Sequence, residues 1–534
     1  MHIHIAAGPA SRSHAWLAIS VAWALAIGLT LNASAATPGA GAANAAAAAV
    51  AANPTASPAV LPITTAPAAP AVPTAPTQTP AASGNADATA ASPQPPTGAG
   101  QRIYERARPQ LLQVRTLLKT QDSQSSVGSG FLVEDGTLLV SNYHVVSQYA
   151  LQPSRHRLVY STVDGQQGAL ELLAFDVVHD LALLRLAQPD ALAGRGAVKL
   201  RPADEALPRG ARIFSLGNPL DVGFAVAEGT FNGQVERSFL PTLFFGGSLS
   251  AGMSGGPALD DEGRLVGVNV AARRDGEQVS FLVPAEFVRN LVASGRSKAP
   301  IVAPAWAEIT RQLLQHEANL SGRFLQLPWR EAGHALYRIP VPQEQFMRCW
   351  GRGSPQAVRG LQFERSDCEM DSRVFVSGSL LTGFITVRHE AYDGSKLGAL
   401  RFSQRYSDSF RNEFIGLDDR QRTAGQCLEQ TVGAASRGGR AGPAGGPEAS
   451  ARSAAANGLP LRAVVCLRAY KKLEGLYDLS VLVATLDKST AGVQGRFDAF
   501  GVSLPSAQRL TQHYLDGFAW KTLRNGPALP NATP

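Results

Sequence analysis

The sequence predicts a mainly β protein, with an all-β barrel or sandwich over about residues 101–298 and a mixed α+β region after it. Short apolar, β-rich runs recur through the first region, and Gly, Pro, Asn and Asp turn residues separate them. Strands and helices do not alternate there, which argues against a parallel α/β fold. Past about Arg296 the pattern changes. Because 534 residues exceed what one core usually organises, we expect two folded domains plus tails.

Residues 1–36 are predicted to be a cleaved secretory signal. Arg12 precedes an apolar run from Ala15 to Leu31, and Ala33-Ser34-Ala35 supplies the small residues that a signal peptidase needs. The alternative is an uncleaved anchor, but the run is short for a membrane span. Residues 37–100 then consist almost wholly of Ala, Pro, Thr, Ser and Gly, without an aromatic residue, and this composition predicts a disordered linker.

The folded part is expected to begin near Gln101 with a short helix and then a first strand from Leu111 to Leu118. Two β-rich runs flank Glu134-Asp135-Gly136, and this Asp-Gly turn predicts a hairpin that delivers His144 at its end. Eight further apolar runs predict strands, at 158–163, 169–178, 181–186, 212–216, 224–227, 258–259, 265–270 and 279–283. A helix from about Pro284 to Ser294 has its apolar residues on one face and closes the region.

Residues 299–534 are predicted to form a separate mixed α+β domain of unknown type. Trp306 to Leu314 has a helical pattern, and strand patterns follow at three places, 375–387, 463–470 and 479–484. Residues 433–458 are so rich in Gly, Ala, Ser and Arg that they predict a disordered loop inside this domain.

All four cysteines lie in the C-terminal region, and none forms a C-x-x-C pair. In an exported chain, two disulfides are favoured over metal binding or redox chemistry. Four cysteines allow three connectivities, and the sequence does not choose among them. The simplest pairs Cys349 with Cys368 and Cys427 with Cys466.

The formal net charge of +7 raises the question of nucleic-acid binding. The arginines are scattered and no basic helix carries interleaved aromatic residues, so a mildly basic, solvated surface is the better explanation and no nucleic-acid partner is expected. The histidines are dispersed, and neither an H-E-x-x-H motif nor a cysteine cluster occurs, so we expect no metal and no cofactor. Beyond the signal, no segment is long and apolar enough to span a bilayer.

The stretch from Gly252 to Pro257, Gly-Met-Ser-Gly-Gly-Pro, is the most informative feature of the chain. It completes a series of three reactive groups in the order His144, Asp180 and Ser254. A serine hydroxyl is a poor nucleophile near neutral pH, so acyl transfer needs an imidazole to take its proton and a carboxylate to orient that imidazole. These three residues can supply the three roles. The backbone N–H groups of Gly252 and Ser254 are expected to form an oxyanion hole.

Each of these residues has a less reactive alternative. The glycine-rich stretch could be an ordinary Gly-Ser turn. His144 could be a core histidine, although the polar residues just before it weaken that interpretation. Asp176 is the competing carboxylate. Asp180 is preferred because it directly precedes the apolar run 181–184, so that it would lie half-buried at the start of a strand.

Six segments resemble, in order, the successive motifs of the trypsin-like serine proteases of chymotrypsin fold, specifically the HtrA (Deg) branch. The segments are Gly-Ser-Gly-Phe-Leu-Val at 128–133, Ser-Asn-Tyr-His-Val-Val at 141–146, Asp-Leu-Ala-Leu-Leu-Arg-Leu at 180–186, Leu-Gly-Asn-Pro at 216–219, Gly-Met-Ser-Gly-Gly-Pro at 252–257 and Val-Ser-Phe-Leu-Val-Pro at 279–284. The resemblance covers about Gln101 to Ala293. It implies two six-stranded barrels with the site in the cleft between them, and His144, Asp180 and Ser254 in the roles given above.

Two features depart from the family pattern. Met253 stands where the digestive members carry an aspartate that pairs with a freed N-terminal amine, and where the HtrA branch usually has asparagine. A zymogen switch of that kind is therefore excluded, and the effect of the methionine on the oxyanion loop is left open. The chain after Ala293 has no Gly-Leu-Gly-Phe loop or other PDZ signature, so a PDZ domain is not expected.

The resemblance also suggests where the substrate side chain binds. In trypsin-like pockets the position six before the nucleophile, here Ser248, lies at the base, and Val279 and Phe281 belong to a segment that could form a wall. No acidic residue is there to receive Arg or Lys. We therefore expect a preference for small or medium apolar side chains.

The predicted function is that of an exported, periplasmic or secreted serine endopeptidase acting on protein or peptide substrates, with envelope or misfolded proteins as the expected targets. One alternative is a catalytically idle barrel that binds misfolded chains or envelope partners. An esterase is less favoured, because the nucleophile elbow of α/β-hydrolases needs a helix after the serine and a later histidine, whereas Pro257 and a β run follow here. The sequence leaves open whether the chain forms a homo-oligomer, as many HtrA relatives do.

Overall fold

The fold is that of a computed structural model of the chain. It describes residues 97–272, 279–343, 345–355, 360–411, 419–433 and 459–521. The predicted signal over 1–36, nearly all of the predicted linker over 37–100 and nearly all of the predicted loop over 433–458 lie outside these residues, so those three stay predictions.

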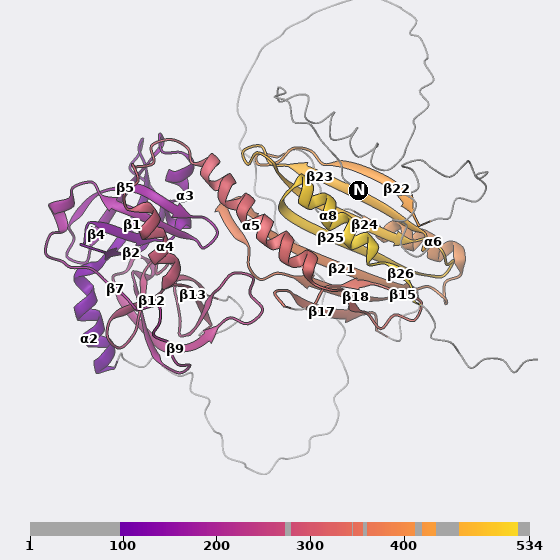
Figure 1. The fold of residues 1–534 in the computed structure, drawn as a ribbon, viewed down its shortest axis with the longest axis horizontal. Coiled ribbons are helices and arrows are strands. Elements are labelled where there is room, and N and C mark those ends of the chain that lie inside the picture. The colour runs from indigo at the N-terminus through magenta and orange to yellow at the C-terminus, as the bar shows by residue number, and fades with distance from the viewer. Residues whose placement is uncertain are drawn as a thin grey trace, which may run out of the picture. The chain divides into compact units, whose positions relative to one another are not determined.

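Six antiparallel strands form the first barrel. They are β1 (Leu111–Leu118), β2 (Gln124–Val133), β3 (Leu138–Ser141), β4 (His156–Thr162), β5 (Gln167–Asp176) and β6 (Leu181–Leu186). The barrel closes in the order β1-β2-β3-β6-β5-β4. Figure 1 labels β1, β2, β4 and β5 of this barrel. The predicted hairpin joins β2 to β3, and its turn uses positive φ angles at Glu134 (57°) and Gly136 (86°).

The second barrel also has six strands, with one short strand added outside the ring. The strands are β7 (Lys199–Leu200), β8 (Arg212–Gly217), β9 (Ala225–Gln234), β10 (Leu243–Gly246), β11 (Pro257–Leu259), β12 (Arg264–Ala272) and β13 (Ser280–Pro284). The order is β11-β8-β9-β10-β13-β12, and pairing of β11 with β12 closes the ring. Strand β7 lies parallel to β12 at its outer edge. Short 3₁₀ turns occur at Arg108–Gln110, Pro189–Leu192 and Pro219–Asp221.

Helix α4 (Ala285–Gly295) joins the two barrels through a common core. Its buried Val288, Leu291 and Val292 belong to one apolar cluster with Leu183 of β6 and Val268 of β12. Burial of this face accounts for the 3.6-residue spacing of its apolar side chains. Two closed six-stranded barrels and this closing helix confirm the predicted fold class.

Three local predictions need correction. Helix α2 (Gly98–Ala107) begins three residues before the expected start, and the Thr97 hydroxyl caps it by accepting a hydrogen bond from Gly100 N. Strands β7 and β10 were not predicted, because they have only two and four residues and β10 ends in a glycine that another glycine follows. His144 does not lie at the end of the hairpin but in helix α3 (Tyr143–Leu151), which begins after β3.

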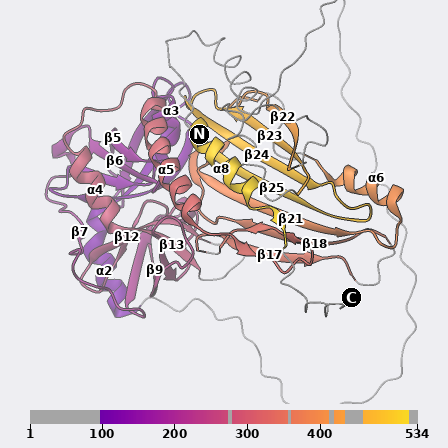
Figure 2. The same cartoon turned by 45° about the vertical axis from the view of Figure 1, so that its right-hand side comes forward.

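The C-terminal region is built on a seven-stranded antiparallel sheet. Its strands, in spatial order, are β17 (Arg348–Gly353), β18 (Gln362–Glu369), β21 (Phe384–Asp393), β25 (Ala491–Ser503), β24 (Leu476–Thr485), β23 (Leu461–Ala469) and β22 (Gln426–Val432). Figure 2 shows β17 and β22 at the two edges. Three small two-stranded sheets accompany it, formed by β14 (Arg330–Glu331) with β16 (Pro340–Val341), β15 (Tyr337–Arg338) with β26 (Ala519–Trp520), and β19 (Val374–Ser377) with β20 (Leu380–Thr382).

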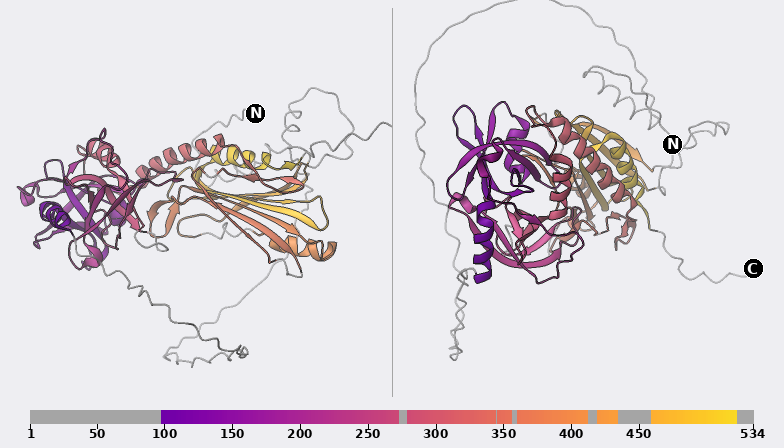
Figure 3. Two further views of the ribbon diagram at one scale, coloured as in Figure 1. Left: turned by 90° about the horizontal axis from the view of Figure 1, so that it is seen from below. Right: turned by 60° about the vertical axis from the view of Figure 1, so that its left-hand side comes forward.

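Helices cover both faces of this sheet. Helices α5 (Trp306–Gln326) and α8 (Leu504–Asp516) run along one face, as the left view of Figure 3 shows. There Phe497 of β25 packs against Phe324 of α5 and Tyr514 of α8. Helix α6 (Ala399–Ser409) covers part of the opposite face. These helices supply the apolar cover that an isolated sheet would lack.

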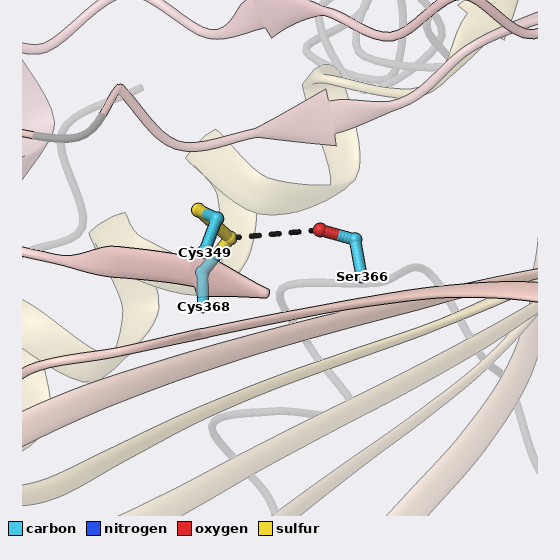
Figure 4. Close-up of a disulfide and its surroundings, with 3 residues drawn as sticks. All are labelled: Cys349, Ser366 and Cys368. Atoms are coloured by element: carbon cyan, nitrogen blue, oxygen red, sulfur yellow. Dashed lines mark hydrogen bonds between the residues drawn. A yellow bond between two sulfur atoms is a disulfide. The ribbon is translucent and has the colours of Figure 1, made fainter. Parts of the chain in front are cut away.

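Two disulfides staple the edges of the sheet. Cys349 of β17 bonds to Cys368 of β18, its direct partner across the strand pair (Figure 4), and Ser366 Oγ lies 3.8 Å from Cys368 Sγ. Cys427 of β22 bonds to Cys466 of β23 in the same way at the other edge. The structure therefore has the simplest of the three connectivities that the sequence allowed.

Candidate active site

His144 and Asp180 lie in direct contact. His144 Nδ1 donates to Asp180 Oδ2 at 2.6 Å, and the backbone N–H of His144 donates to Asp180 Oδ1 at 2.8 Å. Burial alone would lower the pKa of His144, but the charge of Asp180 and the hydrogen bond to it outweigh burial and raise that pKa above its ordinary value of 6.5. The arrangement holds the imidazole by its Nδ1 side and leaves Nε2 as the proton acceptor.

Asp180 reaches His144 through a strained backbone conformation. Its φ of 56° is one that few residues other than glycine adopt, although aspartate is among those that tolerate it. Its carbonyl accepts hydrogen bonds from Asn142 Nδ2 (2.7 Å) and Tyr143 N (3.2 Å), so the start of α3 holds the turn in place. Strain that neighbouring groups enforce in this way is typical of functional sites.

The competing carboxylate, Asp176, is engaged elsewhere. It accepts a hydrogen bond from His179 Nδ1 at 2.7 Å and further bonds from the backbone N–H groups of Val178 and His179, both at 3.0 Å. Burial would raise the pKa of Asp176, but these bonds to His179 and the neighbouring backbone lower it below 3.8. Of the two carboxylates, Asp180 is therefore the one in contact with His144.

The turn that carries Ser254 depends on glycine. Gly252 and Gly255 have φ angles of 92° and 84°. A Cβ on Gly255 would lie 2.3 Å from Ser129 O and 2.9 Å from Asn142 N, so only glycine lets the turn approach the start of α3 this closely. Asn142 is two residues before His144 in the chain, so this approach places the Ser254 turn beside the segment that carries the histidine.

Ser129 ties together three of the sequence motifs that carry the family resemblance. Its hydroxyl donates to Gly252 O (2.7 Å) and accepts from Asn218 N (2.9 Å), while its backbone N–H donates to Ser254 O (2.8 Å). Ser141 Oγ donates in turn to Ser129 O at 2.7 Å. Ser129 belongs to the Gly-Ser-Gly-Phe-Leu-Val motif at 128–133, but the sequence did not predict a role for it. A small hydroxyl residue between two glycines inside a β-rich run was the available signal.

Asn269 is a second positioning residue that the sequence missed. Fully buried, it donates from Nδ2 to Leu216 O (2.9 Å) and Met253 O (3.2 Å), and its backbone C=O accepts from Gly255 N (2.9 Å). A polar side chain inside the apolar run 265–270 was the signal that could have revealed it, because buried amides need partners.

Met253 can occupy its place in the turn because the residue packed against it, Gly217, has no side chain. Its own side chain is buried, and a Cβ on Gly217 would lie 2.7 Å from Met253 Cα and 3.0 Å from Met253 Cβ. Gly217 belongs to the Leu-Gly-Asn-Pro motif, so the fit involves the same segment that Ser129 contacts.

The hydroxyl of Ser254 is hydrogen-bonded to a backbone carbonyl. Ser254 Oγ donates to Val270 O at 3.3 Å, and among the residues that the structure describes no hydrogen bond joins it to His144. A rotation about the Cα–Cβ bond of Ser254 changes this partner without moving the backbone.

The two expected oxyanion donors lie in this turn. Within the described part of the chain, neither Gly252 N nor Ser254 N has a hydrogen-bond acceptor, whereas the N–H of Met253 between them donates to Ser250 O at 3.1 Å. Free backbone N–H groups next to a nucleophile can stabilise a developing negative charge.

The three predicted pocket residues come from two segments that meet. Leu249 N, next to Ser248, donates to Ser280 Oγ at 3.2 Å, and Ser280 lies between Val279 and Phe281. Ser248 is exposed and Phe281 is half-buried. No acidic side chain pairs with any of these three within the described residues.

Other kinds of site are not found where the structure gives positions. Over residues 97–521, apart from the gaps given above, no three His, Cys, Asp or Glu side chains gather in a way that could hold a metal ion. Over the same ranges no helix has both the length and the apolar character needed to cross a bilayer.

Comparison with known proteins identifies the type of the double barrel. Residues 128–268 match the family model of the trypsin-like peptidase domain. The chain is 24% identical over 233 residues to Protease Do-like 1, chloroplastic, of Arabidopsis thaliana, covering 39% of this chain and 50% of that protein. It is 25% identical over 298 residues to the Serine protease Do-like HtrA of Bacillus subtilis, covering 52% and 60%.

Among solved structures, the serine endoprotease from Yersinia pestis is 21% identical and covers 38% of this chain and 67% of that chain, with a TM-score of 0.32. The family and curated-protein matches confirm the predicted resemblance to HtrA-type trypsin-like serine proteases, and the residues that match the family model, 128–268, lie in the double barrel. The chain spans 50% and 60% of the lengths of the two curated relatives.

Proposed function

We propose that the HtrA-type double barrel of this chain is a working serine endopeptidase, in which His144, Asp180 and Ser254 form the triad. The observation that carries the proposal is the two-point contact between His144 and Asp180, at 2.6 and 2.8 Å. A carboxylate that binds Nδ1 fixes the tautomer in which Nε2 can take a proton from a serine.

The reaction follows from these contacts. Once Ser254 Oγ turns from Val270 O towards Nε2 of His144, the imidazole removes its proton as Oγ attacks the scissile carbonyl. The N–H groups of Gly252 and Ser254 stabilise the oxyanion, and the imidazolium passes its proton to the leaving amine. Water then hydrolyses the acyl-enzyme by the same route in reverse.

The test is covalent labelling of the folded protein with a fluorophosphonate probe, followed by mass spectrometry of the modified peptide. We expect one adduct, on Ser254, and turnover of an unfolded protein substrate such as casein. Ser254→Ala is the control and should lose both signals. Folded wild-type protein that neither reacts with the probe nor cleaves the substrate would contradict the proposal.

A second candidate has one observation in its favour. The hydrogen bond from Ser254 Oγ to Val270 O at 3.3 Å fits a catalytically idle barrel that binds unfolded chains. The same assay separates the two functions, because an idle barrel would bind unfolded casein without labelling or cleavage.

Export and substrate class belong to the same proposal. The apolar run before Ala33-Ser34-Ala35 supports a secretory signal, and two disulfides suit an oxidising compartment. We propose a periplasmic or secreted protein that cleaves envelope or misfolded proteins. Fragments that accumulate in envelope extracts treated with the wild type, but not in those treated with Ser254→Ala, would identify the targets.

A further inference from the structure

The β19–β20 hairpin of the C-terminal region is packed against the helix that carries His144. Tyr143, the first residue of α3, is fully buried and its hydroxyl donates to Val376 O of β19 at 3.1 Å. Val374, Val376 and Leu380 of the hairpin are buried in one apolar cluster with residues of α3 and the first barrel. The hairpin therefore shares its core with the site of the proposed protease.

The strand geometry turns Phe375 towards the catalytic histidine. Successive side chains of a strand point to opposite sides, so Phe375 faces away from its buried neighbours Val374 and Val376. Its ring lies edge-on to His144, with 6.1 Å between ring centroids and 78° between ring planes. Leu381 is its direct cross-strand partner and shares its side of the hairpin.

The base and tip of the hairpin are both anchored. Gly383 N donates to Phe500 O (2.9 Å) and Gly383 O pairs with His316 Nε2 (3.0 Å), which fixes the base to β25 and α5. At the tip, Gln421 Nε2 donates to Ser379 Oγ at 3.0 Å. A contact surface held at several points can select between substrates, because it does not have to be ordered when they bind.

The hairpin borders the site without sealing it. The His144 side chain keeps 30% of its surface exposed, and Leu381 is 44% exposed. A plug over the site would bury both. An apolar surface beside an accessible general base is instead suited to contact a substrate side chain.

Resting on the proposed protease function, we propose that Phe375 and Leu381 form an apolar subsite for the substrate residue that precedes the scissile residue. Alternate side chains of an extended peptide point in opposite directions. If the scissile residue points into the pocket near Ser248 and Phe281 of the second barrel, the preceding residue points towards the first barrel, where His144 and Phe375 lie. The C-terminal region thus supplies part of the specificity of the barrel site.

The test uses the full chain and two fluorogenic peptides that share the scissile residue and differ only in the residue before it, leucine or glycine. In the wild type we expect kcat/KM to favour the leucine peptide. Phe375→Ala should lower the leucine-to-glycine ratio by about tenfold, the size of effect that one apolar contact gives in a specificity pocket. Phe375→Leu should keep most of the ratio.

Matched variants keep the result interpretable. Leu381→Ala removes an exposed side chain of the same surface and should lower the ratio by a smaller factor, even if Phe375→Ala were to unfold. Leu400→Ala, at a residue 89% exposed on α6, should leave the ratio unchanged. An unchanged ratio in both hairpin variants would overturn the proposal, and so would an equal gain on both peptides, which would indicate a plug.

The outcomes also separate this proposal from the one on which it rests. Absence of fluorophosphonate labelling in the wild type would remove the protease function itself. Normal labelling of Ser254 together with a ratio that does not respond to Phe375 or Leu381 would remove only the subsite.

Discussion

The double barrel and the C-terminal sheet are both antiparallel, but they differ in how their strand edges are protected and in how their histidines are partnered. Each barrel closes on itself and contains no cysteine, whereas the open sheet has a disulfide at each edge. Closure removes unpaired strand edges, and an open sheet must protect them by other means. In the barrel, His144 is paired with a carboxylate, while His389 in the sheet is buried and has no charged partner among the residues that the structure describes.

This difference shows that the reactive groups lie in the double barrel, whereas the disulfides that stabilise the fold lie in the sheet. In the barrel region a histidine with a raised pKa, a strained aspartate and a glycine-dependent turn gather at one place. In the sheet, covalent links and neutral burial serve stability instead. Changes in either region should therefore give different readouts.

The largest effect in the double barrel is expected when the charge that orients His144 is removed. Asp180→Asn should lower kcat/KM by about 10⁴-fold, because a serine protease that loses the correct histidine tautomer loses activity on that scale. Steady-state kinetics on a peptide substrate measures it. Asp176→Asn is the matched control and should retain most of the activity, because Asp176 pairs with His179. Equal losses in the two variants would contradict the assignment.

The sheet side is broken by removing one disulfide at a time. Replacing either cysteine pair by alanine should lower the free energy of unfolding by about 2–4 kcal/mol. The Cys427–Cys466 link spans 39 residues and the Cys349–Cys368 link spans 19, so loss of the former should cost about 0.6 kcal/mol more. Urea denaturation measures both losses. Ser254 labelling of the folded variants should match the wild type, and a loss of labelling without unfolding would link the edges to the site.

His389 allows a test of neutral burial. Its Nε2 lies 3.3 Å from the Tyr514 hydroxyl, and burial lowers its pKa to about 3. The unfolded chain takes up a proton near pH 6.5 and the folded chain does not, so the contribution of this histidine is fully present above pH 6.5 and is lost as pH falls towards 3. The loss amounts to about 1.4 kcal/mol per pH unit. His389→Leu should flatten that part of the stability profile, and an unchanged slope would rule the idea out.

The smallest expected effect is a shift in the pH dependence of activity, which is set by the pKa of His144. His144 must be neutral to act as a base, and its raised pKa means that it stays protonated to a higher pH. The acid limb of kcat/KM should therefore have its midpoint above 6.5 and should move down in Asp180→Asn, where the charge is gone. A pH–rate profile of both proteins checks this. A midpoint below 6.5 in the wild type would contradict it.

Prediction from sequence worked best where a short pattern decides the structure. The alternation and turn residues of the first region located nearly all of the barrel strands, and the Asp-Gly turn at 135–136 located a hairpin. It failed at helix α3, which was not predicted and in which Val145 and Val146 are β-branched residues of low helix propensity. Both are fully buried, so tertiary packing of this helix on the barrel outweighed their β propensity. Strand β10 was missed because a four-residue run carries too little periodicity.

The residues of the candidate site also fall into two groups, those that the sequence predicted and those that only the structure revealed. The residue types and their order pointed to His144, Asp180 and Ser254, because few other combinations can activate a serine. Ser129 and Asn269 were missed, since their hydrogen bonds join segments far apart in the chain. Phe375 could not be found at all, because no pattern near it refers to a histidine more than two hundred residues earlier.

By itself the sequence determined a β-rich first region, the order of its reactive groups and the presence of a second β-rich region. It could do so because turn chemistry and hydrophobic alternation act over a few residues. Only the tertiary structure decided which carboxylate contacts His144, which cysteines pair and which hairpin lies beside the site. Those outcomes depend on contacts between distant segments, and such contacts exist only once the chain is packed.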